Sequence, residues 1–131
     1  MEFSGNCDDN GEFTFEVSAI FHRDSSWVVA RQVDARLLEH EQGHFDLAEI
    51  YARRLSRALR GLPEACEDIE ETRTLIQTLL NLNQQELEEE QRRYDIETRH
   101  GTSKRKQGTW TDALRRRLFV TETSAENRET P

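Results

Sequence analysis

Residues 37–53 read LLEHEQGHFDLAEIYAR, and this stretch decides how the chain is organised. Its apolar residues recur at intervals of three and four, which is the period of an amphipathic α-helix. Asp34 is a candidate N-cap before it, and Gly61 and Pro63 follow in the order that ends a helix. The pattern predicts one long helix from about residue 34 to residue 60.

The residues before this helix have the period of a strand. Apolar and polar side chains alternate over residues 12–22, which is typical of a half-buried β-strand. The turn-forming run from Asp8 to Gly11 predicts a hairpin return from a short strand near Phe3. Residues 27–29 are a candidate for a further short strand.

Two more helices are expected after residue 62. The first runs from about Pro63 to Arg99, with a possible break at residues 81–83 because asparagine is a weak helix former. The second runs from about Thr109 to Val120. The long helix has a nearly coiled-coil seam, formed by Ile69, Ile76, Leu80, Leu87 and Tyr94. We therefore expect one α+β domain over residues 1–120, followed by a disordered polar tail over residues 121–131.

Composition narrows the range of partners. The net charge is −8 and the apolar fraction is 34%, so nucleic acid would be repelled on average. Basic residues 104–106 and 115–117 are interpreted as a solvated helix flank. No run of residues approaches the ~18 apolar positions of a membrane span, and the first residues lack a signal-peptide pattern. We expect neither nucleic acid nor a membrane as partner.

The cysteines, Cys7 and Cys66, lack the Cys-x-x-Cys spacing of a zinc ribbon. In an oxidising compartment they could form a disulfide that closes a loop of about 60 residues and stabilises the fold by roughly 4 kcal/mol. Two free thiols are the alternative, and the sequence leaves both open.

Residues 40–44 read HEQGH and carry the chemistry. On a helix, His40 and His44 lie about 40° apart around the axis and ~6 Å apart along it, so both imidazoles can bind one cation. Glu41 points to the side, where it can reach a water on the metal without ligating the metal itself. This predicts a zinc site with Glu41 as catalytic base. Gly43 costs the helix roughly 1 kcal/mol relative to alanine, which indicates close approach of a strand or a substrate.

A catalytic zinc needs a third protein ligand. His100, Asp95 and Glu97 are the candidates, because an antiparallel pair of helices brings the end of the second helix past the start of the first. The second helix would overshoot the histidines unless it bends or breaks. The residues themselves leave the choice open.

Residues 37–53, together with residues 25–28, 94–101 and the pair Gln107 and Trp110, resemble the signature of a bacterial family of unknown function. That family is generally described as predicted secreted zinc-dependent proteases. The resemblance implies a zincin-like fold and a periplasmic or secreted location, with the cytoplasm as the alternative. It also implies that His100 is the third zinc ligand.

The expected function is that of a zinc metallopeptidase acting on a peptide or protein substrate. Glu41 would take a proton from the attacking water and pass it to the leaving amine. Tyr94 is a candidate hydrogen-bond donor to the oxyanion, and Asp46 or Asp95 could orient a ligand imidazole. The strand at 12–22 could hold an extended peptide by strand addition.

Two other functions use the same features. A zinc-stabilised binding or scaffold protein would have the same ligands without turnover. A metal-free helical interaction module follows from the seam of the long helix, which could pack within the chain or form a dimer.

Overall fold

The computed structural model describes residues 1–19, 35–62 and 66–129, with side chains up to residue 121. Strands β1 (Glu2–Cys7) and β2 (Phe13–Ser18) come first, and helices α2 (Ala35–Arg60), α3 (Ile69–Thr98) and α4 (Lys104–Glu129) follow. A small antiparallel sheet followed by helices is the α+β class predicted from the sequence. The predicted short strand at 27–29, the N-cap at residue 34 and the end of the 12–22 strand lie outside the described residues.

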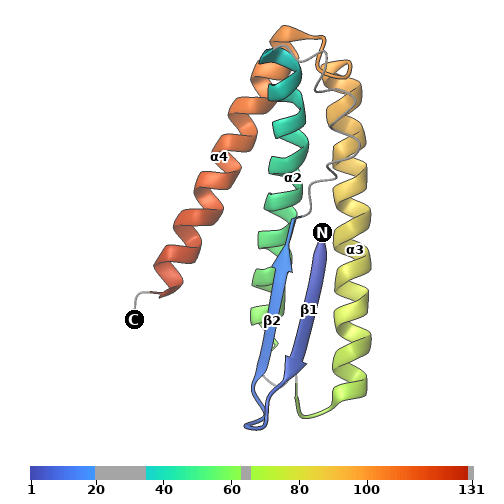
Figure 1. Ribbon diagram of the computed structural model, residues 1–131, viewed down its shortest axis with the longest axis vertical. Coiled ribbons are helices and arrows are strands. Elements are labelled where there is room, and N and C mark those ends of the chain that lie inside the picture. The colour runs from blue at the N-terminus through green and yellow to red at the C-terminus, as the bar shows by residue number, and fades with distance from the viewer. Residues whose placement is uncertain (20–34, 63–65, 130–131) are drawn as a thin grey trace.

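The two strands form the predicted hairpin. Their antiparallel register runs from Glu2 opposite Ser18 to Cys7 opposite Phe13. Asp8 closes the turn, because its carboxylate accepts the backbone N–H groups of Asn10 and Glu12 at 2.9 and 2.8 Å. Alternate residues of β2, beginning with Phe13, are partly buried. The hairpin lies along the C-terminal half of α2 (Figure 1).

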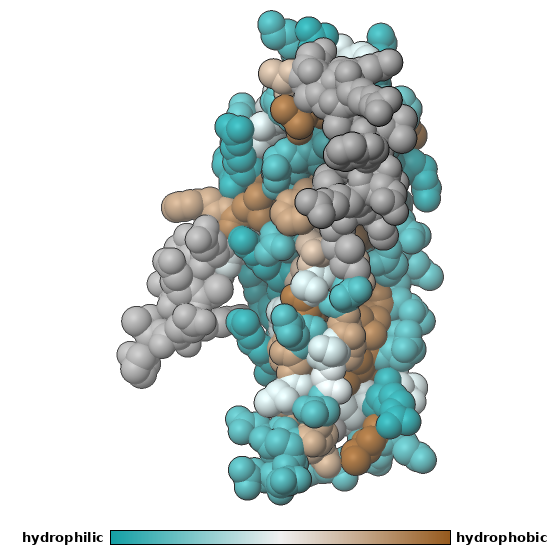
Figure 2. Space-filling view, in the orientation of Figure 1, coloured by the Kyte–Doolittle hydropathy of each residue, from teal (hydrophilic) through white to brown (hydrophobic). Residues whose placement is uncertain are grey.

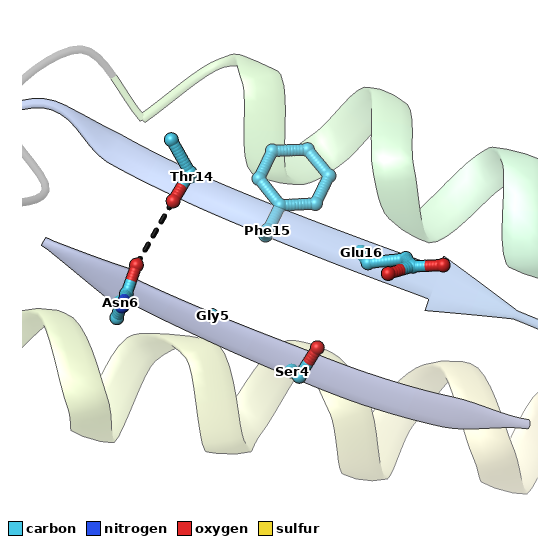
Figure 3. A pocket seen from close by; sticks show the side chains of 6 residues that line it. All are labelled: Ser4, Gly5, Asn6, Thr14, Phe15 and Glu16. Carbon is cyan, nitrogen blue, oxygen red and sulfur yellow. Dashed lines mark hydrogen bonds between the residues drawn. The ribbon is translucent and has the colours of Figure 1, made fainter. Parts of the chain in front are cut away.

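The hairpin surface has a shallow hollow of about 390 Å³ between the two strands (Figure 3). Ser4, Gly5 and Asn6 of β1 line it together with Thr14, Phe15 and Glu16 of β2. Thr14 donates a hydrogen bond to the Asn6 side chain at 2.9 Å across it. None of the histidines predicted to bind zinc lines this hollow.

Helix α2 lies between α3 and α4 (Figure 1). All three helices contribute to the buried apolar cluster, which consists of Leu47, Ile50, Tyr51, Leu87, Tyr94 and Leu114. Hydrophilic residues cover the outer sides of the helices, and hydrophobic residues gather between the elements (Figure 2). None of the described helices has the length and apolar character needed to cross a membrane.

Helix α3 is continuous, so the candidate break at residues 81–83 does not occur. Asn83 is only 4% exposed, and its side-chain amide donates to the Tyr51 carbonyl at 3.1 Å. This tertiary hydrogen bond outweighs the weak helix propensity of asparagine. Helix α3 also begins later than predicted, with Asp68 as N-cap accepting the N–H of Glu71 at 3.1 Å. The later start removes much of the predicted overshoot.

The seam of α3 is fully buried only toward its C-terminal end, while Ile76 and Leu80 are partly buried. Leu87 and Tyr94 are 5% and 0% exposed, whereas Ile69 is 56% exposed. The third helix differs more from the prediction, since it begins at Lys104 and continues to Glu129. No glycine or proline occurs between residues 109 and 129 to end it. The helix thus extends past the predicted end at Val120, while the disorder expected for residues 121–131 stays a prediction.

Cys7 and Cys66 form a disulfide, with their Cα atoms 5.9 Å apart. The bond joins the last residue of β1 to the connection between α2 and α3. Of the two alternatives left open by the sequence, the structure has the disulfide.

Candidate metal centre

The beginning of α2, the end of α3 and the beginning of α4 meet at one end of the molecule (Figure 1). His40 and His44 are one turn apart on α2, and both face Asp95 of α3. Their Nε2 atoms lie 2.9 and 2.7 Å from the same carboxylate oxygen, Asp95 Oδ1. Two imidazoles and one carboxylate thus converge on a single point.

The three residues have the donor atoms and the spacing of a metal site. One ligand atom from each of His40, His44 and Asp95 lies within 4.8 Å of the others. The His40 side chain is 4% exposed, whereas those of His44 and Asp95 are 25% and 30% exposed. The group is therefore closed on the His40 side and open to solvent on the other. Imidazole nitrogen and carboxylate oxygen are ligands that zinc binds in proteins.

Two glutamines contact the far side of the imidazole rings. Gln107 of α4 places its Oε1 2.9 Å from His40 Nδ1. Gln91 of α3 places its Oε1 against His44 Nδ1 and donates from Nε2 to the His44 carbonyl at 2.8 Å. Asp46, predicted as a possible orienting residue, instead accepts a hydrogen bond from Gln42 at 2.8 Å.

Neither glutamine has a role that was expected from the sequence. Gln107 belongs to the pattern that resembles the bacterial family, and Gln91 lies one helical turn before Asp95 on the same face of α3. The i, i+4 relation to a candidate ligand was the signal that could have identified Gln91.

Tyr94 lies beneath the imidazoles and is fully buried. Its hydroxyl donates to the His40 carbonyl at 2.9 Å and accepts from Gln107 Nε2 at 2.7 Å. Its ring stacks on that of His40, with the centroids 4.7 Å apart. Burial is the main cause that raises the pKa of Tyr94 to about 12. The predicted oxyanion role does not fit this environment, because the hydroxyl proton is already donated and solvent does not reach the side chain.

Gly43 explains how Tyr94 can lie so close to α2. A Cβ atom at this position would be 2.0 Å from the Tyr94 hydroxyl oxygen and 2.5 Å from Tyr94 Cζ. The sequence predicted close approach of a strand or a substrate at Gly43, whereas the structure has the Tyr94 ring there. Gly101 has a similar role with a φ of +87°, since a Cβ on it would lie 2.8 Å from His40 Cβ.

The three candidates for the third ligand lie in different places. Asp95 contacts both imidazoles, as described above. His100 follows the end of α3 in a left-handed conformation with φ 56°, and its Nδ1 is 4.0 Å from Asp95 Oδ1. Its side chain is 80% exposed, which places it at the rim of the site. Glu97 points toward α4, where it accepts a hydrogen bond from Trp110 at 3.2 Å.

Glu41 lies on α2 directly after His40 and is half-buried. Among the residues that the structure describes, it forms no side-chain hydrogen bond or ion pair. Its carboxylate is therefore not engaged by another described side chain.

Residues 22–101 match a family described as bacterial protein of unknown function (DUF922). The match covers more than half of the chain, which therefore belongs to this family. It includes both histidines of α2, Asp95 and His100, and it ends before α4. Comparisons with curated proteins and with solved structures found no match.

Proposed function

We propose that this member of the DUF922 family is a zinc-dependent metallopeptidase. His40, His44 and Asp95 would hold the metal, and Glu41 would serve as general base on a peptide or protein substrate. The observation that supports the proposal is the convergence of His40 Nε2 and His44 Nε2 on Asp95 Oδ1, at 2.9 and 2.7 Å.

The residues fit a catalytic zinc better than a structural one. Structural zinc sites in proteins have four protein ligands, whereas catalytic sites have three and keep one position for water or substrate. Two histidines and one carboxylate are such a set of three. The partly exposed side chains of His44 and Asp95 leave room for a substrate. His100 remains the rival third ligand, because it lies at the rim of the same site.

The chain's own residues would divide the work. A zinc ion acts as a Lewis acid on a carbonyl and lowers the pKa of a coordinated water toward ~7. The Glu41 carboxylate would take a proton from the attacking water and return it to the leaving amine nitrogen. Tyr94 would support His40 from below without touching the substrate. The zincin-like architecture that the family resemblance implies is part of this proposal.

We also propose that the protein acts in the periplasm or outside the cell. The Cys7–Cys66 disulfide supports this location, because disulfides persist in oxidising compartments and are rare in the cytosol.

A zinc-stabilised scaffold without turnover is the second candidate. It is favoured by one observation, namely that hydrogen bonds of the site join all three helices. His40 of α2 contacts Asp95 of α3 and Gln107 of α4. A zinc ion held there would link α2 to α3 and stabilise the folded chain by mass action.

Zinc stoichiometry of the purified chain is the first test. We expect about one zinc per chain, lost in His44→Ala and in Asp95→Asn but retained in His100→Ala. Loss in His100→Ala with retention in Asp95→Asn would assign the third position to His100. No zinc after reconstitution would refute the metallopeptidase.

Glu41→Gln separates the enzyme from the scaffold. The variant should keep its zinc and lose hydrolysis of an unfolded protein substrate, because the amide cannot accept the proton. Glu49→Gln on the same helix is the control, since it removes only the partly exposed ion pair with Arg53 at 3.0 Å. If hydrolysis survives in Glu41→Gln, the mechanism is wrong. If the zinc-loaded wild type hydrolyses no peptide, the scaffold is favoured.

A further inference from the structure

We infer that Gln91 and Gln107 are positioning residues that fix the tautomer of the two histidines. Each would hold its imidazole with the hydrogen on Nδ1 and the lone pair on Nε2, aimed at the Asp95 oxygen. The inference deepens the proposed function and rests on it insofar as these lone pairs serve a metal ion.

For His44, the argument begins with the amide of Gln91. Its Nε2 lies 2.8 Å from the His44 carbonyl, and a carbonyl oxygen can only accept. This contact fixes which end of the amide carries the hydrogens. The other end, Oε1, must therefore face His44 Nδ1, and it can only accept from it. For this contact to be a hydrogen bond, His44 Nδ1 must carry the hydrogen, so a neutral ring turns the lone pair of Nε2 toward Asp95.

For His40, the same conclusion follows through Tyr94. The Tyr94 hydroxyl donates its only hydrogen to the His40 carbonyl at 2.9 Å, so it offers Gln107 a lone pair. Gln107 must then present its NH₂ group to Tyr94, at 2.7 Å, and its Oε1 to His40 Nδ1, at 2.9 Å. For the contact with Gln107 to be a hydrogen bond, His40 Nδ1 must likewise carry the hydrogen, which leaves the lone pair of Nε2 facing Asp95.

Thr98 supports this assignment from a third direction. Its hydroxyl lies 3.4 Å from His40 Nδ1, but it donates its hydrogen to the Tyr94 carbonyl at 2.7 Å. Toward the ring it therefore presents a lone pair as well. Every described polar group around His40 Nδ1 is an acceptor, which leaves that nitrogen as the donor.

The two glutamines thus orient both imidazoles so that their Nε2 lone pairs, together with the Asp95 carboxylate, can bind a cation. With both hydrogens on Nδ1, each Nε2 presents a lone pair to the carboxylate oxygen of Asp95, which is itself an acceptor. Three lone pairs directed at one point are suited to bind a metal ion. Histidines that bind a metal generally donate the hydrogen of their other ring nitrogen to a carbonyl or carboxylate oxygen. Neither glutamine needs to touch the metal to determine its site.

The direct test is ¹H–¹⁵N long-range correlation spectroscopy of the full chain labelled at histidine. The metal-free protein is measured with each imidazole carrying a single ring hydrogen. We expect the Nδ1–H tautomer for both His40 and His44. The exposed His100 is the internal reference, because a neutral imidazole in water favours the Nε2–H form. Signals are assigned with His22→Gln and His100→Gln. The Nε2–H tautomer at His40 or His44 would overturn the inference.

Variants of Gln91 test the same point through zinc affinity. Gln91→Met removes the acceptor at similar volume and should weaken zinc binding about 10–100-fold, with His44 changing to a mixture of tautomers. Gln91→Glu keeps an acceptor for Nδ1 and should restore most of the affinity. Gln84→Met, which is also on α3 and exposed, is the control for the helix. Wild-type affinity in Gln91→Met would contradict the positioning role.

The tautomer measurement also separates this inference from the proposed function. It uses metal-free protein and needs no activity. If both histidines have the Nδ1–H form but the chain binds no zinc, the positioning of the rings stands and the metallopeptidase fails. If the chain binds zinc and cleaves peptides with the Nε2–H form at either histidine, the metallopeptidase stands and the role of the glutamines is refuted.

Discussion

Replacing Gly43 by alanine should destabilise the protein although it improves the helix. In an exposed helix interior this substitution stabilises by about 1 kcal/mol. Here the added methyl group would lie 2.0 Å from the Tyr94 hydroxyl oxygen and 2.5 Å from Cζ. Distances this short cannot persist, so either Tyr94 or α2 must move.

The cost follows from what holds Tyr94 in place. Its ring is fully buried, and forcing extra volume into a packed core costs about 1–3 kcal/mol. A displaced hydroxyl would also lose its hydrogen bonds to the His40 carbonyl and Gln107, each with a net value of about 1 kcal/mol. These losses exceed the gain in propensity, and we expect a net destabilisation of about 2–4 kcal/mol.

Urea denaturation followed by circular dichroism measures this change, with Gly108→Ala as the matched control. Gly108 also lies inside a helix, but a Cβ atom there would meet nothing within 4 Å. The control should therefore be stabilised by up to about 1 kcal/mol. Opposite signs for the two glycine-to-alanine variants are the expected result. In thermal denaturation, Gly43→Ala should lower Tm by on the order of 10 °C.

Two results would refute this reasoning. One is a Gly43→Ala variant as stable as Gly108→Ala, which would mean that Tyr94 does not pack against this position. The other concerns the double variant Gly43→Ala with Tyr94→Phe. Removing the hydroxyl removes the closest atom, so the two changes should destabilise by less than their sum. Strict additivity would show that the methyl group and the hydroxyl do not meet.

Two further predictions concern the rest of the fold. Glu90 is buried, which by itself would raise its pKa, but the hydrogen bonds and charge of Arg117, at 2.9 and 2.8 Å, lower that pKa overall. The stabilisation of the fold by the Glu90 carboxylate is therefore complete at neutral pH, and it is lost as the pH falls below the range in which a free glutamate titrates. Glu90→Gln should lower the free energy of unfolding by roughly 1–3 kcal/mol at pH 7. In urea denaturation, the difference in stability between the variant and the wild type should shrink from about pH 5 to about pH 3. Replacing both Cys7 and Cys66 by serine should lower the free energy of unfolding by about 4 kcal/mol without changing zinc content, because the disulfide is remote from the histidines; an unchanged urea midpoint would contradict this.

The elements that the sequence predicted well are those with a strong local period. The repeat of residues 37–53 predicted α2, and the alternation after Gly11 predicted β2 with its turn. In both cases the pattern is local, because it is formed by residues of the helix or strand itself.

The predictions that failed depend on contacts between elements. The continuity of α3 depends on the hydrogen bond from Asn83 to Tyr51, 32 residues away in sequence. The candidate metal site shows the same difference between local patterns and contacts between elements. The i, i+4 spacing alone predicted His40 and His44, whereas choosing Asp95 over Glu97 requires knowing which face of α3 meets α2. For the same reason Gln107, which reaches His40 from another helix, could not be assigned a role from its spacing.

Several buried polar side chains gather at the histidine end of the helical core. Near the histidines, His40, Thr98 and Gln107 are 3%, 0% and 1% exposed, where apolar side chains of similar size would pack without directional requirements. Burying such groups contributes little net stability, because desolvation offsets most of the hydrogen-bond energy. Yet no buried side-chain nitrogen or oxygen in the described residues lacks a partner. A network that is complete but adds little stability is better explained by the orientation that it gives to the His40 and His44 rings. The family match ends at residue 101, before α4, so Gln107 supports, from outside the matched region, a candidate ligand that lies within it.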